Sequence, residues 1–132
     1  LLRSDFSQGL PFRDSVFSHA VSVSAIQWLT TERARESFFA SLWRVLASGG
    51  RAALQFYPSG PRDAEKMLQT ALKGESHCFA GGLVMDMPHS APQRKWYLCL
   101  RKVECVACKE GLSSLPQCEL AFPYRASCAL SW

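Results

Sequence analysis

The chain has 132 residues, of which 48% are hydrophobic and 20% are charged, the balance of an ordinary globular protein of one domain. This composition argues against a disordered chain. No window approaches the roughly 18 consecutive apolar residues of a membrane-spanning helix, so we expect no membrane partner. The net charge of +4 is dispersed along the chain, which permits an RNA partner without requiring one. The first residues lack a basic region followed by an apolar run, so we expect no signal peptide.

The first predicted strand covers residues 20–25, where valine alternates with serine at the period of two that strands require. A helix is predicted next, from Glu32 to Ala47, because Thr30-Thr31 offers an N-cap and Glu32 suits the first helical turn. Ser48-Gly49-Gly50 should end this helix, since glycine adopts the left-handed conformation at low cost. The apolar positions that form its buried stripe are Phe38, Phe39, Leu42, Val45 and Leu46.

A second strand is predicted over residues 51–57 and is ended by Pro58. A second amphipathic helix should follow Pro61, because proline is well tolerated at a helix start, and it should end near Gly74. Its apolar stripe consists of Ala64, Met67, Leu68, Ala71 and Leu72.

Two further strands are predicted over residues 82–87 and 95–101. The polar loop between them is too short for a crossover helix, so this last pair should be antiparallel. The element order is therefore β-α-β-α-β-β, which is typical of an α/β fold. After Lys102 the periodicity fades, and residues 103–132 are expected to form an irregular tail that contains cysteines.

Six cysteines follow residue 77, and no cysteine precedes it. Cys105 and Cys108 have the spacing of a zinc knuckle, but Cys118 and Cys128 lie ten residues apart and supply no second close pair. Free thiols are therefore favoured over a structural zinc site or disulfides, which stay as alternatives. We expect no metal to be bound.

Two polar segments flank the first predicted strand, and α/β sheets place their ligands at such strand ends. Residues 5–12 precede the strand, and residues 22–29 continue from its carboxyl end. Each segment has a plain explanation, with Asp5 as a solvated turn residue, Gln27 as a helix-start amide and Trp28 as a core indole. From the residues alone, these plain explanations are favoured.

Residues 5–29 resemble the third and fourth motifs of class I S-adenosylmethionine-dependent methyltransferases. Segments 38–58, 81–91 and 95–100 narrow the resemblance to the eukaryotic small-subunit (18S) rRNA guanine-N7 methyltransferases of the bud-site-selection type. The resemblance spans residues 3–102. It implies an α/β fold that is the C-terminal half of a Rossmann-like methyltransferase sheet, with strands four to seven, two helices and an antiparallel last strand.

In domain terms, the resemblance implies that residues 1–102 are a partial methyltransferase domain and that residues 103–132 are a tail outside it. The glycine-rich first motif, which wraps the methionine and ribose of the cofactor, does not occur in the sequence. The acidic residue of the second motif, which holds the ribose hydroxyls, is also absent. We therefore expect the chain alone to bind the cofactor weakly or not at all and to be inactive.

The resemblance implies a cofactor site for S-adenosylmethionine. Asp5 matches the aspartate whose carboxylate accepts a hydrogen bond from the adenine amino group, and Phe6 matches the residue whose backbone N–H meets the adenine ring. Ser24 and Ala25 match the part of the fourth motif beside the methionine end of the cofactor. The family prefers glycine where Ser7 stands, so Ser7 is expected to strain a backbone position that requires a positive φ.

The resemblance also implies a binding site for the target base. Gln27 and Trp28 belong to the fourth motif, and Tyr57-Pro58 lies where family members form the pocket wall. Flipped bases are held by aromatic stacking, and Trp28 is the candidate for this role, with packing in the core as its alternative. The family prefers aspartate where Ser18 stands, so this chain lacks one carboxylate near the site.

The expected reaction is methyl transfer to guanine N7 of small-subunit rRNA, as part of ribosome biogenesis. Guanine N7 carries a lone pair and no proton, so the reaction requires placement of the base and no catalytic general base. The resemblance implies rRNA and a small zinc-binding activator subunit as partners, and a location in the nucleus, nucleolus and cytoplasm. A small-molecule or acyl-carrier methyltransferase and a non-catalytic truncated fragment are the alternatives.

Three other groups of residues are weaker candidates for a functional site. Asp14, Ser18 and His19 are close in sequence, but no feature of the sequence orients them as a hydrolase triad. The adjacent His77-Cys78 is expected to be structural. The charged residues Glu32, Arg35 and Glu36 are expected to form a solvated helix face.

Overall fold

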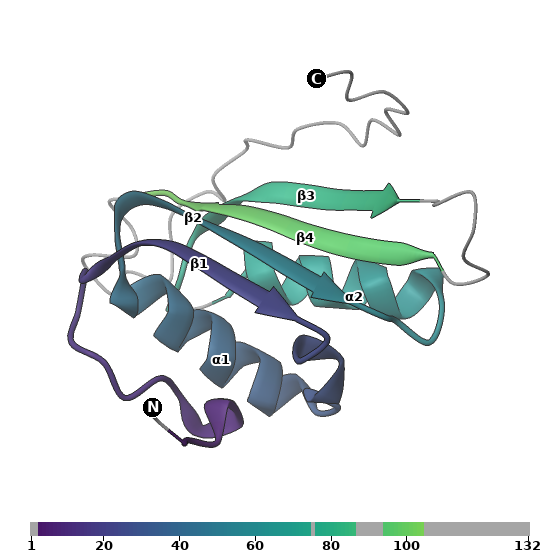
Figure 1. Cartoon of the computed structure of the whole chain (residues 1–132), viewed down its shortest axis with the longest axis horizontal. Helices are drawn as coiled ribbons and strands as arrows, with labels where there is room; N and C mark the ends of the chain where they lie inside the picture. The colour runs from purple at the N-terminus through teal and green to yellow at the C-terminus, as the bar shows by residue number, and fades with distance from the viewer. Residues whose placement is uncertain (1–2, 75, 87–93, 105–132) are drawn as a thin grey trace.

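A computed structural model describes residues 3–74, 76–86 and 94–104. In it, one sheet of four strands carries two α-helices on one of its faces (Figure 1). The strands are β1 (Phe17–Val23), β2 (Leu46–Phe56), β3 (Phe79–Asp86) and β4 (Lys95–Lys102). The helices are α1 (Glu32–Val45) and α2 (Pro61–Leu72), with two short 3₁₀ helices, η1 (Phe6–Gln8) and η2 (Ile26–Trp28).

The strand order in the sheet is β1-β2-β4-β3. Strands β1 and β2 are parallel and are connected by α1, whereas β4 is antiparallel to both of its neighbours, β2 and β3. The predicted order β-α-β-α-β-β and the antiparallel last pair are therefore confirmed. The predicted strand positions are confirmed as well, although β1 and β3 begin three residues earlier than expected and β2 begins five residues earlier.

The start of helix α1 was predicted correctly, because the Thr31 hydroxyl accepts a hydrogen bond from the Ala34 N–H at 3.2 Å. Its predicted end was wrong. The helix ends at Val45, and Leu46 already has extended backbone and belongs to β2. No glycine is needed to end it, since Leu46 keeps a hydrogen bond from its N–H to the Leu42 carbonyl and then turns directly into the strand.

The two glycines expected to end the helix lie within β2 instead. The pairing of β1 with β2 shifts between Phe17, which pairs with Leu46, and His19, which pairs with Arg51, so β2 contains extra residues there. Gly49 has a φ of 72° in this irregular stretch. The left-handed conformation expected of a glycine is present, but it bends a strand rather than ending a helix.

The hydrophobic core lies between the sheet and the two helices. Residues at alternate positions of β2 and β4 point towards the helices and are buried. Helix α2 begins at Pro61 as predicted and ends at Leu72, two residues before the predicted end. The core residues from the strands and α-helices are Leu46, Ala52, Leu54, Phe56, Phe79, Leu98, Leu100, Phe38, Phe39, Leu42, Ala64, Met67 and Ala71.

The predictions for most of the cysteine-containing tail, residues 105–132, fall outside the described residues. In the described part, Cys99 of β4 is a free thiol. Within the same ranges no group of histidine, cysteine and acidic side chains is arranged to hold a metal ion. None of the helices found there has the length and hydrophobicity to cross a membrane.

Candidate functional site

The carboxyl end of β1 is fixed to β2 through Ser24. Ser24 has a φ of 53°, so the chain turns sharply as it leaves the strand. Its N–H donates to the Gln55 carbonyl at 3.0 Å, and its hydroxyl donates to the Gln55 side-chain Oε1 at 3.0 Å. Two hydrogen bonds to one partner stabilise a backbone conformation that serine rarely adopts.

Gln55 is a site residue that sequence reasoning missed. Its side chain is only 7% exposed, and its Nε2 has no hydrogen-bond partner among the described residues. A buried polar group without a partner costs about 1–3 kcal/mol, so the bonds of Gln55 to Ser24 are kept at this position at some cost in stability. The available signal was a glutamine inside an otherwise apolar run, Ala52-Ala-Leu-Gln-Phe56.

The short helix η2 holds Gln27 and Trp28 next to Ser24, at the carboxyl ends of β1 and β2. We term this part of the sheet the Ser24 corner. Ile26 and Leu29 are buried and anchor η2, and the Gln27 Oε1 accepts a hydrogen bond from the Tyr57 N–H at 3.3 Å. Trp28 lies between these anchors and is 74% exposed. The alternative in which Trp28 packs in the core is therefore wrong, and the indole is available to a ligand.

Tyr57 and Pro58 follow β2 and lie at this corner, since the strand ends at Phe56 as its predicted end near Pro58 indicated. Tyr57 is 36% exposed, and Pro58 is half-buried at the start of the turn into α2. The structure thus brings together the carboxyl ends of the two parallel strands with the residues Ser24, Ala25, Gln27, Trp28, Gln55, Tyr57 and Pro58.

Asp5 lies at the N-terminus of η1 and is exposed. Its Oδ1 accepts hydrogen bonds from the Ser7 N–H at 3.0 Å and from the Ser7 hydroxyl at 2.7 Å. These bonds, together with one from the Gln8 amide, hold the pKa of the Asp5 carboxyl below its usual value. Asp5 is therefore an ionised acceptor in a fixed orientation, which suits both a solvated turn residue and an adenine contact.

The strain expected at Ser7 is absent, because Ser7 has helical backbone in η1 and positive φ occurs at Gly9 instead. Phe6 packs edge-on against Phe38 of α1, with ring centroids 5.6 Å apart. Asp5 and Phe6 are therefore held on α1, and within the described ranges no hydrogen bond connects them to the Ser24 corner. The predicted cofactor residues thus form two groups.

Arg35 connects the candidate site to the helices, which corrects its interpretation as part of a solvated face. Its Nε donates to the Leu29 carbonyl at 2.8 Å, and one terminal nitrogen donates to Asp63 Oδ1 of α2 at 3.0 Å. The Arg35 side chain is only 13% exposed. Its guanidinium therefore fixes the end of η2 against both helices.

The other weak groups have structural roles. Asp14 forms an ion pair with Arg44, while the Ser18 hydroxyl lies 3.1 Å from Nδ1 of the neighbouring His19, so the carboxylate does not orient this histidine as in a triad. His77 is buried against the core and its Nε2 bonds to the Thr70 carbonyl at 2.9 Å. The expectation that His77 is structural is therefore confirmed.

The sequence of this chain is similar to a known domain family and to proteins of described function. Residues 1–54 match a family model described as a methyltransferase domain. The chain is 37% identical to the bovine 18S rRNA (guanine-N(7))-methyltransferase, in a match that covers 86% of this chain and 42% of the relative. It is 43% identical to the Arabidopsis thaliana enzyme of the same description, in a match that covers 76% of this chain and 36% of that relative. The chain thus spans less than half the length of these curated relatives.

Solved structures agree on the fold. A SAM-dependent methyltransferase from Methanosarcina mazei superposes with a TM-score of 0.53 at 15% identity, covering 76% of this chain and 65% of that one. A protein solved in work on the conversion of a disulfide bond into a thioacetal group during echinomycin biosynthesis gives a TM-score of 0.55 at 10% identity, with 76% and 54% covered. At such low identity these likenesses show the fold alone.

Proposed function

We propose that this chain is part of a class I S-adenosylmethionine-dependent methyltransferase domain and that the complete protein methylates guanine N7 of small-subunit rRNA. The proposal is supported by the matched methyltransferase domain model and by the similarity to the 18S rRNA (guanine-N(7))-methyltransferases. The observation that carries the proposal is the corner at the carboxyl ends of β1 and β2. There, an exposed Trp28 stands beside Ser24, whose strained backbone is held by Gln55. Ligands of α/β folds bind at such strand ends.

The cofactor would supply the methyl group, and this chain would hold part of it. Asp5 offers an ionised acceptor for the adenine amino group, and the Phe6 backbone offers a donor to the ring. This assignment is supported by the exposed carboxylate, which Ser7 and Gln8 hold in one orientation. Ser24 and Ala25 would border the methionine end of the cofactor.

Trp28 would hold the target guanine by stacking. Gln27, Tyr57 and Pro58 would form the adjoining wall, and the hydrogen bond between Gln27 and the Tyr57 N–H would keep that wall in place. Guanine N7 carries no proton, so no residue of this chain has to remove one. Catalysis then consists of holding N7 in line with the methyl group at about 3 Å, the separation of a near-attack arrangement.

The proposed partners are inferred from the similarity to the 18S rRNA (guanine-N(7))-methyltransferases. The substrate would be rRNA, and a small zinc-binding activator subunit would accompany the complete enzyme. Its work in ribosome biogenesis would place it in the nucleus, the nucleolus and the cytoplasm. That subunit would pair a strand with the sheet at an edge outside this chain, so we expect the 132-residue chain alone to bind it poorly.

The test uses the complete protein with its activator, labelled S-adenosylmethionine and a small-subunit rRNA fragment. Label should enter the RNA at one guanosine. Replacing guanosine by 7-deazaguanosine, which lacks the N7 lone pair, should abolish incorporation without weakening RNA binding. Methylation that persists on the 7-deaza substrate would contradict the proposal, as would transfer to small molecules in place of RNA.

A further inference from the structure

The starts of α1 and α2 lie near the Ser24 corner, because each helix follows the carboxyl end of a parallel strand. Arg35 lies near the start of α1, and Asp63 lies in the first turn of α2. The two side chains form an ion pair, in which a terminal nitrogen of Arg35 lies 3.0 Å from Asp63 Oδ1. They are only 13% and 28% exposed, so salt and water screen this pair less than a pair on the open surface.

Each member of this ion pair also binds a segment of the Ser24 corner. The Arg35 Nε donates a hydrogen bond to the Leu29 carbonyl, at the end of η2, at 2.8 Å. Asp63 Oδ2 accepts hydrogen bonds from the N–H and from the hydroxyl of Ser59, in the loop between β2 and α2, each at 3.2 Å. The ion pair therefore connects the end of η2 with the loop between β2 and α2.

The two connected segments contain the residues proposed to hold the target base. Helix η2 contains Gln27 and Trp28, and the loop after β2 begins with Tyr57 and Pro58. One direct contact already joins the segments, the hydrogen bond from the Tyr57 N–H to the Gln27 Oε1 at 3.3 Å. A single contact limits the distance between two segments but lets them pivot, whereas a second connection also fixes their relative orientation.

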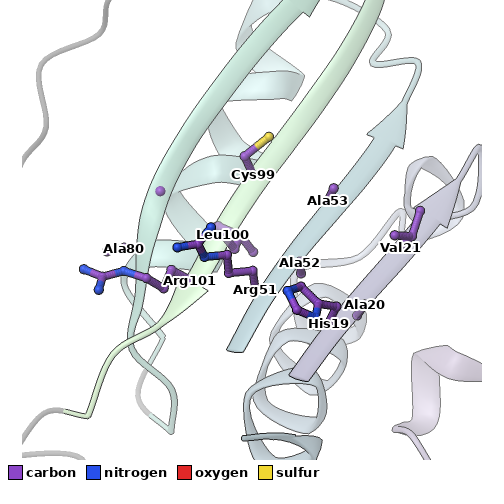
Figure 2. Close-up of a pocket in the computed structure, with 11 residues that line it drawn as sticks. His19, Ala20, Val21, Arg51, Ala52, Ala53, Ala80, Cys99, Leu100 and Arg101 are labelled. Atoms are coloured by element: carbon purple, nitrogen blue, oxygen red, sulfur yellow. The ribbon is translucent and has the colours of Figure 1, made fainter. Parts of the chain in front are cut away.

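The face of the sheet opposite the helices gives this orientation little support. Gln55 binds Ser24 there, but the next side chains of β1 and β2 on that face are Val21 and Ala53. Both are apolar and line a groove of about 500 Å³ (Figure 2), so they can form no side-chain hydrogen bond with η2 or with the loop after β2. Within the described residues, the second connection between the two segments comes from the helix side.

We infer that Arg35 and Asp63 are positioning residues for methyl transfer, because they fix the two sides of the base site relative to each other. The inference rests on the proposed function, since it assigns these residues a role in that reaction. A displacement of about 1 Å at a reacting centre can lower a rate about a hundredfold. Loss of the connection should lower the rate and leave cofactor affinity unchanged, because Asp5 and Phe6 are held by other contacts.

The test uses Arg35→Lys and Asp63→Asn in the complete protein with its activator, with circular dichroism to establish that each variant is folded. Lysine keeps the charge, but its single nitrogen cannot replace the two separate donors of the guanidinium. Asparagine keeps the size, but it has one acceptor oxygen in place of two. At saturating cofactor and rRNA, each variant should lower the single-turnover methylation rate about tenfold or more, while the dissociation constants of S-adenosylmethionine and of the RNA change less than about twofold. Since both changes break the same connection, the double variant should be no more than about twofold slower than the slower single variant.

Arg44→Lys is the matched control, because Arg44 lies on the same helix and its guanidinium also binds backbone carbonyls and a carboxylate, those of Leu10, Phe12 and Asp14. It should leave the rate at saturating cofactor unchanged. Wild-type rates in Arg35→Lys and Asp63→Asn would overturn the inference alone. Losses that multiply in the double variant, or equal losses of rate and cofactor affinity, would assign the ion pair to stability and would overturn it as well. A wild-type protein that does not methylate guanosine in rRNA would overturn the proposed function, and the inference with it.

Discussion

Buried His77 shows how one residue couples the stability of this domain to pH. Its ring lies beside Phe39 and Phe79, its Nε2–H donates to the Thr70 carbonyl, and its Nδ1 has no hydrogen-bond partner in the described part of the chain. Glu36 lies 3.9 Å from that Nδ1. Burial lowers the pKa of His77 below the ordinary histidine value of 6.5, although the Thr70 contact and Glu36 oppose the shift.

The lowered pKa of His77 predicts the direction of a pH effect. Below about pH 6.5 the unfolded chain binds a proton at this position more readily than the folded chain does, so stability present at neutral pH is lost as the pH falls. Urea unfolding of the complete protein should give a lower free energy at pH 5.5 than at pH 7.5. His77→Gln, which keeps a donor for the Thr70 carbonyl, should reduce this difference, whereas the control His19→Gln should not. An unchanged difference in His77→Gln would contradict the assignment.

At the scale of elements, local signals predicted where helices begin and which segments form strands. The Thr31 cap and the proline at the start of α2 both act within a few residues of their positions, so the sequence alone reveals them. The end of α1 was not predictable in this way. Gly49 serves a bulge that exists only because β2 pairs with β1, and that pairing is a tertiary contact.

The pairing of β3 with β4 also predicts that alanine substitutions at two adjacent glycines of β3 change the free energy of unfolding by different amounts. A Cβ on Gly81 would lie 2.0 Å from the Cys99 carbonyl oxygen of β4, whereas a Cβ on Gly82 would meet nothing within 4 Å. Gly81→Ala should therefore lower the unfolding free energy by about 1–3 kcal/mol, the usual cost of overpacking. Gly82→Ala is the matched control and should change it by less than about 0.5 kcal/mol. Equal effects in urea unfolding would show that the pairing of β3 with β4 is misassigned.

At the scale of the molecule, the candidate site combines residues that are neighbours in the sequence with residues that are far apart in it. Motif resemblance pointed to Asp5 and Trp28 as candidate site residues, because each lies in a contiguous segment. The bond between Ser24 and Gln55 joins residues 31 positions apart, and only the folded sheet brings them together. The sequence therefore pointed to exposed residues of the candidate site but not to the buried bonds that hold this part of the chain in place.

The 132-residue chain should bind S-adenosylmethionine too weakly for detection at micromolar concentrations. In the proposed site, Asp5 and Phe6 would contact the adenine and Ser24 and Ala25 would border the methionine end. The glycine-rich motif that wraps the methionine and ribose does not occur in the chain. Binding sites for small molecules bury most of the surface of the ligand, and half a site does not. Isothermal titration calorimetry tests this, with circular dichroism to establish that the chain is folded. Micromolar affinity would show that this chain contains a complete cofactor site.

The most direct test of the central claim compares Asp5→Asn with Trp28→Ala in the complete protein, by cofactor affinity and single-turnover methylation rate on rRNA. Asp5→Asn keeps an oxygen for the Ser7 bonds of η1 but loses the charge, so cofactor affinity should fall about tenfold to a hundredfold, or roughly 1.5–3 kcal/mol. Its rate at saturating cofactor should change less, since the adenine contact is equal in the ground and transition states. Trp28→Ala should lower the rate and leave cofactor affinity nearly unchanged. Equal losses of affinity and rate in both variants would contradict the division of this site into a cofactor end and a base end.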